Sequence, residues 1–149
     1  MKTKYLFVVL YLFLSAQSFA EEKHISLEKL QADEDFESGC GCSVANSKEE
    51  TLIFSDLQEK APAIVRISGQ KKVLKWISTT EKSGSPKKGD AFIRVYGNGS
   101  AKLKLNYKTT FVCGKSDESC EVTRYSVNTT LEDGKKKSEM KNLKGDCGC

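Results

Sequence analysis

Apolar and polar residues alternate through most of the chain after residue 50, and this pattern predicts β-strands. From Thr51 onward, short runs rich in Val, Ile, Thr, Tyr and Phe are separated by turn residues, which is typical of an all-β domain. We expect strands over residues 51–55, 62–68, 71–79, 90–97, 101–113, 119–131 and 135–143.

The run over residues 101–113 has the clearest alternation. Because side chains of a strand point alternately to its two faces, one face is apolar and packs inward while the other is polar. The run over 119–131 alternates less regularly, which predicts a bulge or burial on both faces. Trp76, the only tryptophan, is interpreted as a core side chain. The inward set of the first run is Leu103, Leu105, Tyr107, Thr109, Phe111 and Cys113, and the outward set is Lys102, Lys104, Asn106, Lys108 and Thr110.

Several turns between these runs indicate hairpins. Gly97-Asn98-Gly99 favours a tight type I′ turn, because Asn and Gly tolerate positive φ, and Asp133-Gly134 and Ser68-Gly69 are further turn signals. Strands joined by tight turns run antiparallel. The sequence therefore predicts a single small antiparallel barrel or sandwich, built as a meander of about six to seven strands.

Residues 1–20 have the layout of a secretory signal peptide. Lys2 and Lys4 precede an apolar run that is too short to span a bilayer, and small residues end at Ala20. No second apolar run is long enough for a membrane span. These features favour a bacterial signal and a periplasmic or secreted protein, although a eukaryotic signal looks similar. We expect an acidic N-terminal arm over 21–39 and the β domain over 40–149.

Charge and composition exclude some functions. The chain carries 24 basic and 20 acidic residues, and its net charge of +4 falls to about +2 without Lys2 and Lys4, which argues against a nucleic-acid binder. His24 is the only histidine and lies in the acidic arm, so a Ser-His or Cys-His nucleophile is not indicated. Phosphate-binding glycine loops are also missing. Nothing in the sequence favours an enzyme or a cofactor.

The six cysteines predict three disulfides in an oxidising compartment. Cys113 and Cys120 lie on either side of the connection between the two longest runs, so we expect them to bond to each other. Bonding within one Cys-Gly-Cys cluster needs a strained ring. We therefore expect Cys40 and Cys42 to bond with Cys147 and Cys149, in an order that the spacing leaves open.

Two other interpretations compete with structural disulfides. Four thiolates from Cys40, Cys42, Cys147 and Cys149 could hold zinc or copper(I), although neither cluster has the Cys-x-x-Cys spacing usual for structural zinc. Alternatively, one Cys-Gly-Cys could cycle as a readily reduced disulfide.

The lysines suggest a partner. Lys102, Lys104 and Lys108 align on one face and form a candidate binding face for an acidic protein or an anionic envelope component, or simply a solvated surface. The sequence thus favours an exported, non-catalytic binding or inhibitor-type domain that acts on an envelope or extracellular macromolecule. The alternative is a thiol-redox or metal-handling protein that uses the two Cys-Gly-Cys clusters.

Overall fold

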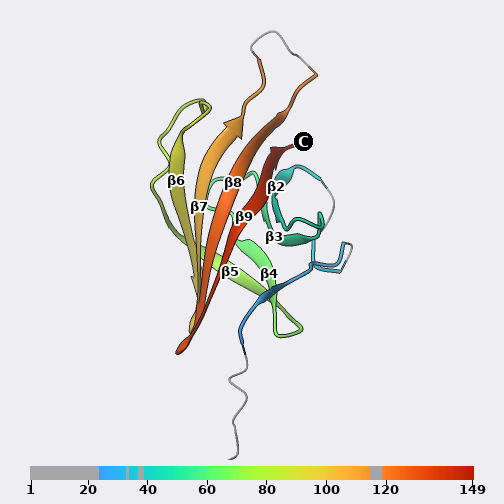
Figure 1. The fold of residues 1–149 in the computed structure, drawn as a ribbon, viewed down its shortest axis with the longest axis vertical. Helices are drawn as coiled ribbons and strands as arrows, with labels where there is room; N and C mark the ends of the chain where they lie inside the picture. Colours follow the sequence, from blue (N-terminus) through green and yellow to red (C-terminus); the bar gives the residue numbers. More distant parts are fainter. Residues whose placement is uncertain (1–23, 33, 37–38, 115–118) are drawn as a thin grey trace, which may run out of the picture.

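The chain forms an eight-stranded antiparallel β-barrel with one additional short strand (Figure 1). The computed structural model describes residues 24–32, 34–36, 39–114 and 119–149. The expected signal peptide over 1–20 lies outside these residues. The strands are β1 (Leu27–Glu28), β2 (Gly41–Ala45), β3 (Thr51–Asp56), β4 (Ala63–Ile67), β5 (Gln70–Thr79), β6 (Ala91–Asn98), β7 (Ala101–Phe111), β8 (Val122–Asp133) and β9 (Lys136–Gly148).

The barrel is an up-and-down meander. Each strand from β2 to β9 pairs with the next one along the chain, and β9 pairs with β2 to close the sheet. Closure satisfies the backbone groups that an open sheet would leave at its edges. The all-β antiparallel prediction is therefore confirmed. The predicted number of strands is too low, because β2 around the first cysteine cluster was not recognised.

Hairpin geometry follows the turn residues. Gly99 and Ser100 join β6 to β7, and only Gly99 of the two has a positive φ, of 60°. This pattern matches a type II′ turn rather than the expected type I′ turn. Ser68 and Gly69, which join β4 to β5, both have positive φ, of 51° and 76°. The type I′ geometry therefore occurs there.

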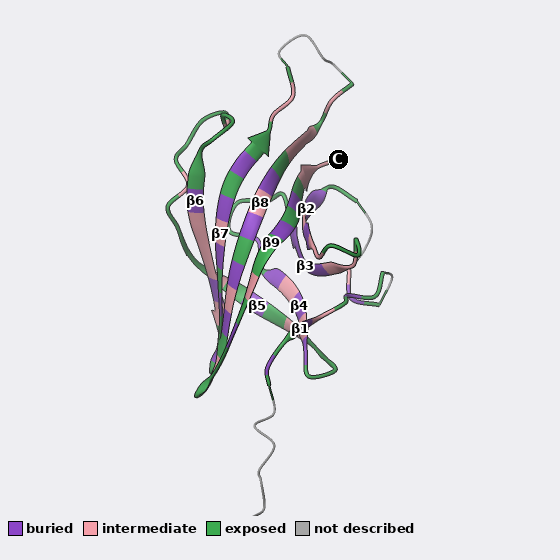
Figure 2. Ribbon diagram, in the orientation of Figure 1, coloured by how far each residue is buried: buried purple, intermediate pink, exposed green. Residues whose placement is uncertain are grey.

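The interior of the barrel follows the predicted alternation from Leu103 to Thr109. Phe111, predicted to point inward, is 41% exposed instead, because a register shift between Thr109 and Phe111 changes the phase of β7. Buried and exposed residues alternate along β7 and β8 (Figure 2). The bulge or two-sided burial predicted for residues 119–131 is wrong for β8, which alternates regularly from Tyr125 to Leu131. The register shift opposite Val127 and Thr129 places the extra residue on β9, where Asn142 has a φ of 57°. The largest fully buried side chains include Tyr96, Ile67, Leu74, Leu103, Leu105, Leu131, Val44, Val65 and Val127.

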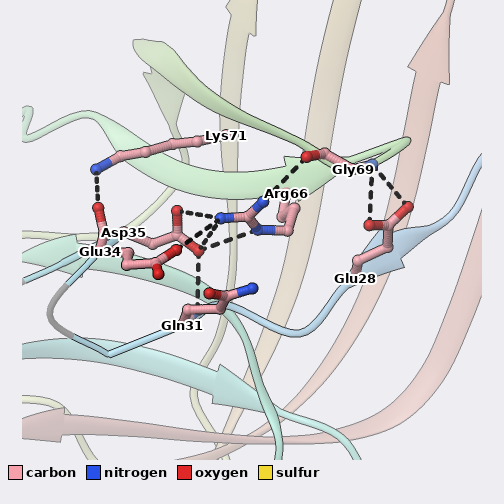
Figure 3. A network of polar contacts seen from close by, with 7 residues as sticks. All are labelled: Glu28, Gln31, Glu34, Asp35, Arg66, Gly69 and Lys71. Carbon is pink, nitrogen blue, oxygen red and sulfur yellow. Dashed lines mark hydrogen bonds and ion pairs between the residues drawn. The ribbon is translucent and has the colours of Figure 1, made fainter.

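The arm before β2 joins the barrel through β1, which pairs with β4, and through Ile25 and Leu27, which are buried in the core. A network of polar contacts also holds it (Figure 3). Arg66 on β4 donates from Nε and Nη2 to the carboxylate of Asp35 at 2.8–3.1 Å. The carboxylate of Asp35 is 1% exposed and also accepts a hydrogen bond from the backbone N–H of Gln31. Glu28 accepts from the N–H of Gly69. The described part of the expected arm thus contains the short strand β1 and a turn in which the N–H of Asp35 donates to the carbonyl of Gln31, and it is held at the β4–β5 hairpin.

No helix in the described residues is long and apolar enough to cross a membrane.

Candidate functional site

The two ends of the barrel are built differently. Strand connections at one end are short, over residues 46–50, 68–69, 99–100 and 134–135. Connections at the opposite end are long, over 57–62, 80–90 and 112–121, and the C-terminal end of β9 lies at that same end (Figure 1). We call this second end the mouth. Ligand sites of β-barrels commonly lie at such an end, because loops can vary there without changing the sheet.

A cavity of about 720 Å³ opens at the mouth. Its size lies within the range of small-molecule sites. Aromatic side chains of Trp76, Tyr96 and Tyr125 line it, and Leu57 from the 57–62 connection also lines it with 49% of its surface exposed. Trp76 packs against the core and meets the ring of Tyr96 edge to face at 5.5 Å. Trp76 is therefore both a core residue and a wall of the cavity.

Arg94 supplies a positive charge on the inner wall of the cavity. Its side chain is only 16% exposed. The guanidinium lies over the rings of Phe92 and Tyr107, at 5.1 and 5.3 Å from their centroids, which stabilises a partly desolvated cation. Nε and Nη2 donate to the same oxygen, Oε2 of Glu81, at 3.0 and 2.6 Å. Glu81 belongs to the 80–90 loop, so this ion pair ties the loop to the barrel wall.

Burial and nearby groups shift the pKa values of Arg94 and of the tyrosines in and beside the cavity. Burial lowers the pKa of Arg94, but the hydrogen bond to Glu81 and nearby groups raise it overall. Burial raises the pKa of Tyr96, Tyr107 and Tyr125. These tyrosines therefore stay protonated as potential hydrogen-bond donors.

The three disulfides all lie at the mouth. Cys113 bonds to Cys120 as predicted, across the neck of the β7–β8 connection. The order left open by the sequence is Cys40 with Cys149 and Cys42 with Cys147. Cys42 and Cys147 are direct neighbours in the β2–β9 register, and their bridge lines the cavity beside Arg94, whose Nη1 lies 3.7 Å from the sulfur of Cys42.

Each glycine between paired cysteines is required by a close approach. A Cβ at Gly41 would lie 2.5 Å from Cζ of Phe54, whose ring stacks on Phe36 of the arm. A Cβ at Gly148 would lie 2.0 Å from the backbone oxygen of Glu121. Cβ atoms do not approach other non-bonded atoms this closely, so the Cys-Gly-Cys sequence reflects packing as well as disulfide formation.

The 80–90 loop covers a second hollow of about 500 Å³. Glu81 and Pro86 line both hollows, so the loop separates them. Thr109 on β7 lines the second hollow, and its hydroxyl is buried without a hydrogen-bond partner among the described residues. An unpaired buried hydroxyl is costly and would gain from a ligand or water contact.

The predicted lysine face lies on the outer wall of the barrel and extends along β7 from Lys102 toward the mouth at Lys108. Lys102, Lys104 and Lys108 are all exposed on the outer side of β7. The structure brings them onto one surface, and their role in binding stays a prediction. His24 is exposed, and the four clustered cysteines are bonded in pairs. The described residues contain no group of three or more His, Cys, Asp or Glu side chains arranged to hold a metal ion.

Sequence reasoning missed Arg94 and Glu81. Arg94 shares its strand phase with Phe92 and Tyr96, while Ile93 and Val95 form an equally apolar opposite phase. Alternation alone could not decide which phase faces inward. The sequence feature that could have identified Arg94 is a single arginine between two aromatic residues, Phe92 and Tyr96, on the same face of one strand.

Comparisons of this chain with protein-family models, with curated proteins and with solved structures find no match. Its function is therefore inferred from the residues of the site.

Proposed function

We propose that this chain is a non-catalytic binding protein of the periplasm or the extracellular space, and that its ligand enters the mouth of the barrel. The observation that supports this proposal is a cavity of about 720 Å³ at the one end of the barrel where all three disulfides lie. Such bonds persist in oxidising compartments. A rim fixed by disulfides loses little conformational entropy when it binds, which favours affinity.

The chemistry of the cavity supports binding rather than catalysis. General acid or base catalysis at neutral pH uses groups whose pKa lies near 7. The two tyrosines that line the cavity, Tyr96 and Tyr125, have pKa values raised above their ordinary value by burial, and the pKa of Arg94 is raised by its contact with Glu81. These groups can donate hydrogen bonds and pack against a ligand without exchanging protons.

A macromolecular partner remains part of this proposal. The exposed lysines of β7 offer an acidic protein or an anionic envelope component a surface on the outer wall of the barrel. A binding protein of this kind could hold a ligand in the barrel and a partner on its wall.

A redox function is the second candidate, because the Cys42–Cys147 bridge borders the cavity. The guanidinium of Arg94 lies 3.7 Å from the Cys42 sulfur, and a nearby positive charge stabilises a thiolate. The distinguishing measurement is reduction of an insulin disulfide by dithiothreitol with and without the protein. Acceleration that disappears in C42A/C147A would support the redox function over binding.

The binding proposal is tested with N-phenyl-1-naphthylamine, a neutral aromatic probe whose fluorescence rises in apolar sites. We expect saturable binding to the wild-type protein. Leu57→Ser should weaken it about fivefold, because burial of part of a leucine contributes about 1 kcal/mol. The matched control is Val73→Ser on β5, because Val73 is similarly exposed, at 43% against 49% for Leu57, but does not line the cavity.

Both variants are first checked by circular dichroism and thermal unfolding. Saturable binding that responds to Leu57→Ser and not to Val73→Ser supports a site at the mouth. No saturable binding, or an equal loss in both variants, would contradict it.

A further inference from the structure

We infer that the ligand of the mouth is a small organic anion with a planar apolar body, and that its anionic group binds Arg94 in place of Glu81. This inference rests on the proposed function, since it names the class of ligand for the same site. Three features of the cavity carry it: a buried cation, a replaceable internal carboxylate and an aromatic wall.

Arg94 is the cation that a ligand would meet inside the cavity. The other basic residues lining it, Lys60 and Lys82, are exposed at the rim. A guanidinium that is largely removed from water interacts with an anion more strongly than an exposed ammonium does, because solvent screens it less. The rings of Phe92 and Tyr107 under Arg94 fix the position of its planar fork.

Glu81 shows that a carboxylate fits against Arg94. Its two contacts with the guanidinium share one oxygen, Oε2. The pair therefore lacks the bidentate geometry, with one hydrogen bond to each carboxylate oxygen, that is strongest between arginine and a carboxylate. The remaining nitrogen, Nη1, donates to the sulfur of Cys42 at 3.7 Å, and sulfur is a weak acceptor. A free ligand can offer an oxygen to each nitrogen, which the loop-bound Glu81 does not.

Displacement of Glu81 is feasible because its carboxylate is 33% exposed and belongs to a loop. Once released, Glu81 regains hydration. The partly buried pair is a real competitor, but the hydration regained by Glu81 offsets part of its loss, and a ligand that offers an oxygen to each nitrogen forms a better fork.

The body of the ligand is defined by the walls. The partly buried Trp76 presents aromatic surface, with the buried rings of Tyr96 and Tyr125 behind it, and Leu57 adds a half-exposed aliphatic side chain. Aromatic side chains pack well against other flat apolar groups. A body of about two fused or linked rings suits a cavity of about 720 Å³.

The rim limits how much charge the ligand can carry. Asp56, Glu59 and Glu121 are exposed there, together with Lys60 and Lys82. Glu59 pairs with Lys60 at 3.7 Å. The remaining carboxylates repel a polyanion. A ligand with a single negative charge is repelled less, and dissolved salt screens this repulsion, so such a ligand can reach Arg94.

The test compares two probes that share an aromatic body. 1-Anilinonaphthalene-8-sulfonate carries an anionic group that N-phenyl-1-naphthylamine lacks. We expect the wild-type protein to bind the sulfonate about tenfold more tightly than the neutral probe, because of the charged fork. Arg94→Gln should abolish this preference, and Arg94→Lys should retain part of it, because lysine keeps the charge without the fork.

Glu81→Gln provides the opposite test. Removal of the competing carboxylate should tighten binding of the sulfonate about threefold or more and leave the affinity for the neutral probe unchanged. Displacement of the bound sulfonate by 1-naphthoate, but not by 1-naphthylmethanol, should extend the preference to carboxylates. Folding of each variant is checked by circular dichroism, and Glu81→Gln decides the question if Arg94→Gln does not fold.

The outcomes separate this inference from the proposed function. If the neutral probe binds at the mouth and the sulfonate binds no better, or if Glu81→Gln weakens the sulfonate, the anion inference is wrong while the binding site stands. If neither probe binds saturably, both are wrong.

Discussion

At the scale of single residues, the glycines inside the Cys-Gly-Cys clusters have a packing role that cysteine spacing does not reveal. Gly148 faces the backbone of Glu121, and Gly41 lies under the ring of Phe54. The cysteine side chains on either side of each glycine lie on the opposite face of the strand, because side chains alternate. The clusters therefore combine a disulfide on one face with a close contact on the other.

We predict that Gly148→Ala lowers the free energy of unfolding by about 2 kcal/mol or more. The added Cβ would lie 2.0 Å from a backbone oxygen, so β9 or the β7–β8 connection must shift. Gly39→Ala is the control, because a Cβ there has no neighbour within 4 Å. Chemical denaturation measures both variants. Equal stability of the two would show that β9 adapts without cost.

Asp35 is a second residue whose effect can be predicted. Burial raises its pKa, but hydrogen bonds from Gln31 and Arg66, together with the positive charges of Arg66 and Lys71, lower it below the ordinary value of 3.8. A folded pKa below the unfolded one means that the ionised carboxylate stabilises the fold at pH values above about 4. This contribution is lost as the pH falls through the folded pKa.

Asp35→Asn should therefore destabilise the protein by about 2 to 4 kcal/mol at pH 7, because it leaves Arg66 without its buried carboxylate partner. The difference between wild type and variant should shrink below pH 4. Unfolding curves at several pH values check this. A difference that is independent of pH would contradict the proposed role of the charge.

At the scale of elements, the sequence predicted the strands that are rich in β-forming residues or follow a clear turn signal, and missed those that have neither. The runs now seen as β3 to β9 were expected because turn residues separate them, and the run of β7 has the clearest alternation. β2 was missed because Gly41 and Cys42 carry no β-strand signal, and the strand forms through pairing with β3 and β9. Local propensity cannot report a strand that depends on distant partners.

The site was less predictable than the fold for the same reason. Glu81 belongs to a polar loop that resembles any exposed connection, and its partner Arg94 lies 13 positions further along the chain. Their contact depends on the antiparallel pairing of β5 with β6, which brings the start of the 80–90 loop beside Arg94. The disulfide connectivity was partly accessible, since Cys113 and Cys120 are local, whereas the order of the other two bridges required the register of β2 on β9.

At the scale of the whole molecule, two parallel bridges join the same pair of strands. Cys40–Cys149 and Cys42–Cys147 span 109 and 105 positions. In the chain-entropy model the first such bridge contributes about 4 to 5 kcal/mol, and the second closes almost no additional loop. Their contributions are therefore far from additive.

We predict that C40A/C149A lowers the free energy of unfolding by less than about 1 kcal/mol. C42A/C147A should cost somewhat more, because Cys42 is buried and its removal leaves space in the mouth. Removal of all four cysteines should cost about 4 to 5 kcal/mol or more. Thermal unfolding of the three variants tests this prediction. If either double substitution alone lowered the free energy of unfolding as much as removal of all four cysteines, the chain-entropy model would be contradicted.

The pairing of β2 with β9 also determines when the disulfides can form during synthesis of the chain. Ribosomes add about 5 to 20 residues per second, so the partner of Cys40, 109 positions away, is synthesised roughly 5 to 20 s after it. During that interval Cys113 and Cys120 are made first and are nearer in the chain. Cys40 and Cys42 can therefore form their native bridges only after Cys147 and Cys149 have been synthesised. The barrel closes only after the last strand is complete.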